Sequence, residues 1–207
     1  MLRKWFLIIS FTFAFTSLLD AQTKFIFTGG PCCGKTTVLK KLQEMGHQVC
    51  PEAYSALHKE ARANGTLNKF STDMIYQRYL IMQRHLEQES RLDPARPAFL
   101  DRSIPDVIFY GNYFNVAMPA DLIQIFEHHK IDYRYVFIFE PVPKILYQQT
   151  ESRQETCAEA AQMHQAVLKW YAERDFRIIH VPFDTVEKRI KFILDQAMCT
   201  PPAYDLK

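Results

Sequence analysis

The stretch KFIFTGGPCCGKTTVLKKL, residues 24–42, decides the fold of this chain. It begins with an apolar run typical of a buried strand, passes through a glycine-rich turn, and ends in a segment whose apolar residues recur at helical spacing. The turn fits the pattern G-x-x-x-x-G-K-[ST] at Gly29, Gly34, Lys35 and Thr36. A strand before this pattern and a helix after it together predict a phosphate-binding loop.

The residue types in this loop suit a bound polyphosphate. Glycines let successive backbone N–H groups face inward, and the start of the next helix adds a partial positive charge. Lys35 is expected to reach the β- and γ-phosphates, Thr36 to offer its hydroxyl to Mg²⁺, and Thr37 to lie beside the α-phosphate. The residues predicted to bind the nucleotide are Gly29, Gly30, Pro31, Cys32, Cys33, Gly34, Lys35, Thr36 and Thr37.

From Thr23 onward, short apolar runs alternate with helical patterns. Strands are predicted at Lys24–Thr28, Gln48–Cys50, Ala98–Asp101, Tyr135–Glu140 and Arg177–Pro182. Helices are predicted at Lys35–Met45, Ala53–Ala63, Thr72–Arg91, Asp106–Phe114, Ala120–His129, Pro143–Gln149, Glu155–Arg174 and Val186–Ala197. This alternation is typical of βαβ units, in which right-handed crossovers bury a parallel sheet between helices. We therefore predict an α/β three-layer sandwich with a parallel five-stranded sheet, forming a single domain over residues 23–207.

Composition limits the function and the location of the chain. Its 207 residues include 25 Lys+Arg and 23 Asp+Glu, and this net charge of +2 gives no basis for predicting nucleic-acid binding. The five cysteines form no C-x-x-C pair. We interpret them as reduced thiols, which, with the nucleotide chemistry, indicates a cytoplasmic protein.

Residues 1–22 indicate a different location. Arg3 and Lys4 precede an apolar run from Phe6 to Leu19, which has the length of a signal-peptide core and is short for a membrane span. Three interpretations stay open. The segment is a signal peptide, an uncleaved anchor that brings the chain into contact with a membrane, or an upstream start that is not used.

Charged residues follow two of the predicted strands, where ligands of open α/β sheets gather. Glu52 follows the second strand and can accept a proton from a substrate hydroxyl, or simply favour the start of a helix through the dipole. Asp101 ends the third strand, where a carboxylate can coordinate Mg²⁺ or orient the acceptor. Arg102 offers a fork for a phosphate or carboxylate. Asp106 is either a further site residue or a helix cap.

Two other charged segments allow alternatives. The polar segment at residues 148–160 has Arg153 at its centre. It is either a lid whose arginine meets the γ-phosphate or a solvated loop in which Glu151 and Glu155 pair with that arginine. One set of charged residues in the last helix is interpreted as an ordinary solvated face: Glu187, Lys188, Arg189 and Lys191.

Several motifs occur in an order that resembles a known family. They are Gly29–Thr37, PEA at 51–53, DRSIPD at 101–106, Arg153, and VPFDTVEKRIKFIL at 181–194. The chain is similar to the NadR-type AAA domain family of small P-loop proteins, which includes the nicotinamide riboside kinase domain. This resemblance runs from Thr23 to about Leu194. It implies a kinase-type P-loop NTPase sandwich with sheet order 2-3-1-4-5, and ATP with Mg²⁺ as the bound species, GTP being the alternative nucleotide.

The PE and DR pairs also resemble those of deoxynucleoside kinases. Carried over by position, the resemblance implies that Glu52 is the catalytic base and that Asp101 is the magnesium or acceptor carboxylate. Arg102 would then hold the substrate. The chain departs from the family at Tyr54 and Ser55, where an arginine is common after PEA.

Two classes of function follow. The first is a small-molecule kinase that transfers the γ-phosphoryl group of Mg·ATP to a hydroxyl of a nucleoside-like acceptor. The second is a nucleotide-binding or slowly hydrolysing module that reports its state to a protein or membrane partner. A kinase needs a second cavity beside the γ-phosphate with Glu52 facing it. In a binding module that space is expected to be closed, or Glu52 to face solvent.

Overall fold

The computed structural model describes residues 23–133, 135–147 and 155–199. The leader at residues 1–22 and the lid candidate Arg153 lie outside these ranges. The elements, in chain order, are β1 (Lys24–Thr28), α1 (Lys35–Glu44), β2 (Gln48–Cys50), α2 (Ala53–Ala63), α3 (Leu67–Thr72), α4 (Met74–Ser90), β3 (Ala98–Asp101), α5 (Ile104–Tyr113), α6 (Ala120–His129), η1 (Lys130–Asp132), β4 (Tyr135–Phe139), η2 (Lys144–Leu146), α7 (Cys157–Ala172), β5 (Arg177–Val181) and α8 (Val186–Cys199).

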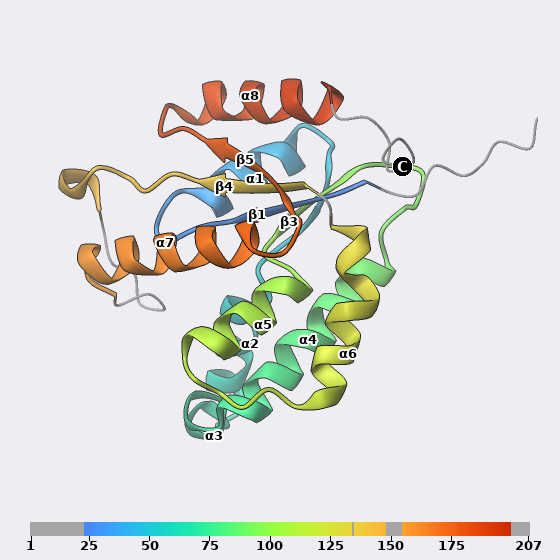
Figure 1. Ribbon diagram of the computed structural model, residues 1–207, viewed down its shortest axis with the longest axis vertical. Helices are drawn as coiled ribbons and strands as arrows, with labels where there is room; N and C mark the ends of the chain where they lie inside the picture. Colours follow the sequence, from blue (N-terminus) through green and yellow to red (C-terminus); the bar gives the residue numbers. More distant parts are fainter. Residues whose placement is uncertain (1–22, 134, 148–154, 200–207) are drawn as a thin grey trace, which may run out of the picture.

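The five strands form one parallel sheet in the order β2-β3-β1-β4-β5. This confirms both the predicted strand positions and the predicted order. Helices α1 and α8 cover one face of the sheet, and α7 covers the other together with α5 (Figure 1). The remaining long helices α2, α4 and α6 pack beyond α5 as a helical lobe (Figure 1). The result is the expected three-layer α/β sandwich, extended on one side by this lobe.

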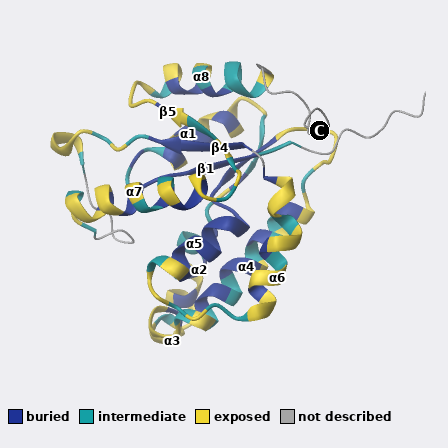
Figure 2. Ribbon diagram, in the orientation of Figure 1, coloured by how far each residue is buried: buried dark blue, intermediate teal, exposed yellow. Residues whose placement is uncertain are grey.

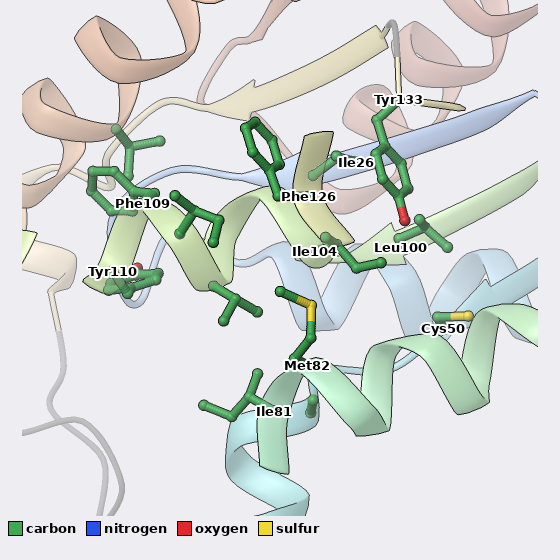
Figure 3. Packing of buried hydrophobic residues seen from close by; sticks show 14 of the residues in the cluster. Ile26, Cys50, Ile81, Met82, Leu100, Ile104, Phe109, Tyr110, Phe126 and Tyr133 are labelled. Carbon is green, nitrogen blue, oxygen red and sulfur yellow. The ribbon is translucent and has the colours of Figure 1, made fainter. Parts of the chain in front are cut away.

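Alternating side chains of the strands separate the core into two halves. Phe25 and Phe27 of β1 belong to the cluster beneath α1 and α8, whereas Ile26 between them belongs to the larger cluster under α5 and α7. In a strand, neighbouring side chains point to opposite faces, so a continuous apolar run covers both faces of the sheet. Figure 2 shows the central strands β1, β3 and β4 largely buried, whereas the edge strand β5 is partly exposed. Figure 3 shows the larger cluster continuing from the sheet into α4 and α5.

Three predicted helices differ from the structure. The helix expected at Thr72–Arg91 begins two residues later, as α4, because the Asp73 side chain accepts a hydrogen bond of 2.9 Å from the Tyr76 amide. The short helix α3 before it was not predicted. Helix α5 begins at Ile104, two residues early, because Pro105 suits a first turn. In the described part of the segment expected to be helical at 143–149, there is only the short 3₁₀ turn η2. Among the described helices, none has the length and apolar character required to cross a membrane.

Candidate active site

The loop between β1 and α1 has the shape that its glycines predict. Gly29 and Gly34 adopt positive φ angles of 123° and 83°. A Cβ on Gly29 would lie 2.8 Å from the backbone oxygen of Phe139, a contact that no side chain tolerates. The loop therefore packs directly against the end of β4 and delivers its backbone to the start of α1.

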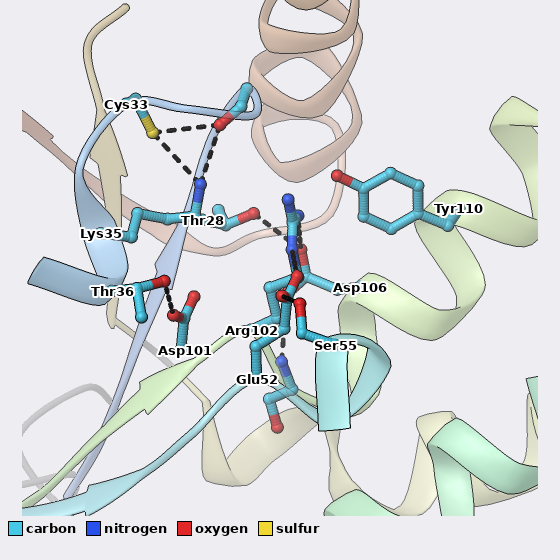
Figure 4. Close-up of polar contacts among 12 residues, drawn as sticks. Thr28, Cys33, Lys35, Thr36, Glu52, Ser55, Asp101, Arg102, Asp106 and Tyr110 are labelled. Carbon is cyan, nitrogen blue, oxygen red and sulfur yellow. Dashed lines mark hydrogen bonds and ion pairs between the residues drawn. The ribbon is translucent and has the colours of Figure 1, made fainter. Parts of the chain in front are cut away.

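Lys35 lies across this loop rather than in solvent. Its Nζ donates a 2.8 Å hydrogen bond to the Gly30 carbonyl and lies 3.1 Å from Cys33 Sγ (Figure 4). The side chain is buried, and within the described chain no carboxylate lies within ion-pair distance of it. A buried ammonium group with only neutral partners favours an anionic ligand. Its position agrees with the predicted contact to phosphate.

Thr36 and Asp101 meet across the sheet edge. Thr36 Oγ1 donates a 2.7 Å hydrogen bond to Asp101 Oδ2, while Asp101 Oδ1 is buried and has no partner among the described atoms. Burial and the nearby Glu52 carboxylate raise the pKa of Asp101, while Lys35 and the Thr36 hydrogen bond counteract this rise. A hydroxyl and a carboxylate with a free oxygen are the hard donors that Mg²⁺ prefers. The two predicted metal ligands therefore fit the ion.

Arg102 follows Asp101 in a left-handed conformation, with φ of 66°. Its amide still continues the sheet, donating to the Phe27 carbonyl at 3.0 Å, but the side chain turns toward α2 and α5. Nε donates to Glu52 Oε1 at 3.1 Å, and the guanidinium lies 4.7 Å from the centre of the Tyr110 ring. Such a backbone costs about 1–3 kcal/mol and is characteristic of functional sites.

Glu52 is held as a site residue and not as a helix cap. Its carboxylate accepts from Arg102 Nε and, at 2.6 Å, from Ser55 Oγ (Figure 4). It makes no side-chain hydrogen bond to the backbone of α2, although it stands at the N-cap position. The two side chains that the sequence placed at separate strand ends, Glu52 and Arg102, are thus brought together.

The Asp106 carboxylate holds the Arg102 side chain in place. Its Oδ1 accepts from Thr28 Oγ1 at 2.7 Å and from Arg102 Nη1 at 3.3 Å; its Oδ2 accepts from Tyr171 OH at 2.9 Å and from the Ser103 amide. Asp106 therefore serves both functions that the sequence left open, since it caps the start of α5 and holds a site residue. It joins β1, α5 and α7 at one buried point.

A cavity of about 330 Å³ opens on the far side of the Glu52–Arg102 pair. Its lining combines this pair and Asp106 with residues of α4, α5 and α7, among them Arg78 and Tyr110. A space of this volume is at the lower end of the range for small-molecule sites. The phosphate loop and the cavity thus lie on either side of Glu52 and Arg102.

Two arginines near the site were not identified by sequence reasoning. Arg78 of α4 was not considered, and Arg189 of α8 was interpreted as solvated, which is wrong. Arg189 is buried; its Nη2 donates to the Cys33 carbonyl at 2.9 Å, and its guanidinium packs 4.6 Å from the centre of the Phe139 ring. Through its hydrogen bond to Cys33, Arg189 stabilises the backbone of the phosphate loop. It lies three residues after Val186, on the apolar stripe of α8, and this spacing was a usable signal.

The sheet order and the phosphate loop define a P-loop protein with a kinase-like fold. The AAA domain family model matches residues 24–189, so the chain belongs to this family, in agreement with the resemblance seen in its motifs. Comparison with curated proteins gives no significant match.

Solved structures show the same fold at low sequence identity. A structure titled as NadR in complex with NR has a TM-score of 0.56 and 15% identity, and covers 85% of this chain and 48% of its own. Thymidylate kinase from Candida albicans has a TM-score of 0.59 and 14% identity, covering 86% and 92%. Thymidylate kinase from Ehrlichia chaffeensis has a TM-score of 0.58 and 15% identity, and the match covers 86% of this chain and 99% of that kinase. The chain spans about half the length of the NadR chain.

Proposed function

We propose that the protein is a kinase that transfers the γ-phosphoryl group of Mg·ATP to a hydroxyl of a small, nucleoside-like acceptor. The observation that carries this proposal is the position of Glu52. Its side chain is 11% exposed and lines the 330 Å³ cavity, while the phosphate loop lies on the opposite side of its partner Arg102. A binding module needs no such second cavity with a carboxylate at its entrance.

The proposed reaction places each side chain in a defined role. Lys35 and the loop amides hold the β- and γ-phosphates, and Arg102 orients the acceptor and the incoming phosphoryl group. Glu52 accepts the proton of the acceptor hydroxyl. The hydroxyl oxygen then bonds to the γ-phosphorus, and the bond from that phosphorus to the β–γ bridging oxygen breaks, which releases ADP.

The metal has a matching place in this scheme. Mg²⁺ held by Thr36 and Asp101 would neutralise phosphate charge beside the reacting group. The unpaired Oδ1 of Asp101 supports this assignment because a buried carboxylate oxygen without a partner is otherwise unfavourable. Arg153, outside the described residues, remains proposed as the contact to the γ-phosphate.

The structural neighbours support the class of substrate. The NadR structures are complexes with NR and with NAD and AMP-PNP, and the other two neighbours compared are thymidylate kinases. We therefore propose ATP as the phosphoryl donor, with GTP as the alternative to be compared, and a nucleoside as the acceptor. The partner class is a small molecule rather than a nucleic acid.

The test measures thermal stability and ADP release with the full chain. Mg·ATP and Mg·GTP are compared first, and then each is combined with a panel of nucleosides that includes nicotinamide riboside. One acceptor is expected to increase stability further and to accelerate ADP release. Glu52→Gln is expected to retain the stabilisation by nucleotide but to lose the acceptor-dependent ADP release. The matched control, Glu60→Gln on the exposed side of α2, is expected to keep both.

The opposite outcome supports the second class of function. If nucleotide stabilises the protein while no acceptor changes stability or ADP release, the kinase proposal is wrong. A nucleotide-dependent contact with a protein or a membrane, the latter through residues 1–22, then becomes the proposal to test. No stabilisation by either nucleotide would contradict the phosphate-loop assignment itself.

A further inference from the structure

The wall of the cavity contains a charged residue without a counter-ion. Arg78 of α4 lines the cavity and is only 4% exposed. Its Nε has no hydrogen-bond partner, and within the described chain no carboxylate lies within ion-pair distance of its guanidinium. Burial lowers the pKa of Arg78 to about 10, so it still carries its charge at neutral pH.

The second arginine of the cavity behaves differently. Arg102 is paired with Glu52 and Asp106, at 3.1 Å and 3.3 Å respectively, so its charge is compensated within the protein. The buried His85, which also lines the cavity, does not compensate Arg78, since burial lowers its pKa and keeps it neutral. Glu155 also lines the cavity, but among the described residues no carboxylate lies within ion-pair distance of Arg78. A buried guanidinium of this kind is costly unless a ligand supplies the anion.

The position of Arg78 defines which end of a ligand it meets. The Tyr110 ring centre lies 4.7 Å from the guanidinium carbon of Arg102 and 6.0 Å from that of Arg78. The two carbons are therefore separated by no more than the sum of these distances, which is within the length of a nucleoside. Arg78 also lies 6.0 Å from the ring centre of Phe114, about one turn farther along α5 from β3. A molecule whose hydroxyl meets Glu52 can thus place its opposite end at Arg78.

We propose that the acceptor carries a carboxylate at the end remote from the phosphorylated hydroxyl, and that Arg78 binds this carboxylate. The inference rests on the proposed kinase function and specifies its substrate class as an acidic nucleoside. A planar guanidinium binds a carboxylate through two parallel N–H···O bonds, which the corresponding amide cannot reproduce. Arg78 is then the residue that distinguishes acid from amide.

Matched pairs of acceptors test the proposal with the full chain. Nicotinic acid riboside is compared with nicotinamide riboside, and 5-carboxyuridine with 5-carbamoyluridine. For each compound, kcat/KM is measured from ADP release, and a dissociation constant is measured in the presence of Mg·AMP-PNP. In at least one pair the acid is expected to be preferred by about tenfold or more. Arg78→Met is expected to abolish this preference without changing the KM for Mg·ATP.

Two further variants control for structural effects. Arg84→Met, on the same helix, removes an arginine that pairs with Glu60 on the surface at 2.7 Å, and it is expected to keep the preference for the acid. Arg78→Gln repeats the loss of charge with a polar side chain. Stabilisation by Mg·ATP reports folding of each variant. If neither Arg78 variant folds, the comparison of acid with amide in the unchanged protein decides.

The outcomes separate this inference from the function on which it rests. Turnover of the amide at least as fast as that of its acid in both pairs would overturn the inference and leave the kinase intact. An acid preference that survives in Arg78→Met would also overturn it. If no acceptor is turned over, the kinase proposal fails. The dissociation constants then decide the inference: tighter binding of the acid, lost in Arg78→Met, upholds it, and equal binding overturns it.

Discussion

Arg102 Nη1 and Asp106 Oδ1 form a buried ion pair at 3.3 Å, and the two side chains are 6% and 2% exposed. Arg102 precedes α5 and Asp106 lies in its first turn, and Arg102 also pairs with Glu52 at 3.1 Å. Because Asp106 also accepts from Thr28 of β1 and Tyr171 of α7, two other elements of the fold fix its position. The orientation of the arginine in the site is thus set by the core rather than by the surface.

This network predicts a large effect of Asp106→Asn. An amide keeps one accepting oxygen but turns an NH₂ group toward two of the four donors that the carboxylate satisfies. We expect the free energy of unfolding to fall by about 3–5 kcal/mol, as when one partner of a buried ion pair is removed. Urea unfolding measures the change. Asp121→Asn, whose carboxylate accepts from Tyr79 at the exposed surface, is expected to cost less than about 1 kcal/mol.

An equal and small effect of the two substitutions would contradict the role of Asp106. In that case, Thr28 and Tyr171 would find other partners at little cost. A double substitution of Arg102 and Asp106 gives a second measurement. Its effect is expected to be smaller than the sum of the two single effects, because both residues belong to one network.

The Lys35→Met substitution is expected to affect nucleotide binding and the stability of the nucleotide-free protein differently. We expect stabilisation by Mg·ATP to be lost and the dissociation constant to rise by at least about tenfold, since a charged hydrogen bond to phosphate is removed. The stability of the protein without nucleotide is expected to change little, because the burial cost of the ammonium group is removed but Asp101 loses a nearby positive charge. Calorimetry and thermal unfolding measure the two effects.

Lys40→Met provides the comparison on the same helix. Lys40 is exposed and lies five residues farther along α1, so nucleotide binding is expected to stay within about twofold of the unchanged protein. Equal binding by Lys35→Met and Lys40→Met would mean that the loop holds phosphate without its lysine.

The phosphate loop was predictable because its signal is local. Strand, glycines, lysine and helix follow one another within residues 24–42, and each has a conformational or electrostatic reason of its own. The location of Glu52 and Arg102 could be predicted by a second rule, since residues that follow parallel strands meet at one edge of the sheet. That rule brought them to the same edge but could not show that they form a pair.

The spacing of Arg78 before the buried Ile81 and Met82 places it on the inner side of α4, but no local pattern shows that a cavity lies beside it. Arg78 and Arg84 stand on the same helix in similar sequence, yet one lines a cavity and the other pairs with Glu60 at the surface. The difference depends on how α4 rotates against α2 and α5, which is a property of tertiary packing. The break at Asp73 before α4 was predictable in principle, because aspartate is a strong N-cap.

Two glycines allow a comparison between rigid and adaptable surroundings. A Cβ on Gly30 would lie 2.8 Å from the backbone oxygen of Ala160 in α7, whereas a Cβ on Gly111 would meet the Met118 side chain at 2.1 Å. A flexible methionine can move, but a helix backbone cannot. Gly30→Ala is therefore expected to cost about 1–3 kcal/mol of stability and to weaken nucleotide binding. Gly111→Ala is expected to cost less, despite the shorter nominal contact; thermal unfolding of the two variants measures the difference.

Asp101 predicts a pH dependence whose sign follows from its environment. Burial, together with Glu52, raises the pKa of Asp101 above its ordinary value of 3.8. A raised pKa in the folded state means that this group favours folding most below pH 3.8, and that its contribution is lost as the pH rises through the raised value. Without nucleotide, Asp101→Asn is therefore expected to gain stability relative to the unchanged protein as the pH rises from 4 to 7. The gain is about 1.4 kcal/mol for each unit by which the pKa is raised.

Magnesium is expected to reverse this advantage of the Asp101→Asn variant. Near pH 7 the variant keeps the hydrogen bond from Thr36 but lacks the anionic oxygen that suits the ion. Mg·ATP is therefore expected to stabilise the variant less than the unchanged protein. ATP with EDTA is expected to stabilise both proteins equally. Urea unfolding at pH 4, 5.5 and 7, with and without Mg·ATP, measures both effects. A stability difference that does not change with pH would show that the Asp101 carboxyl is not perturbed in the fold. Equal stabilisation of both proteins by Mg·ATP would instead place the magnesium ion away from Asp101.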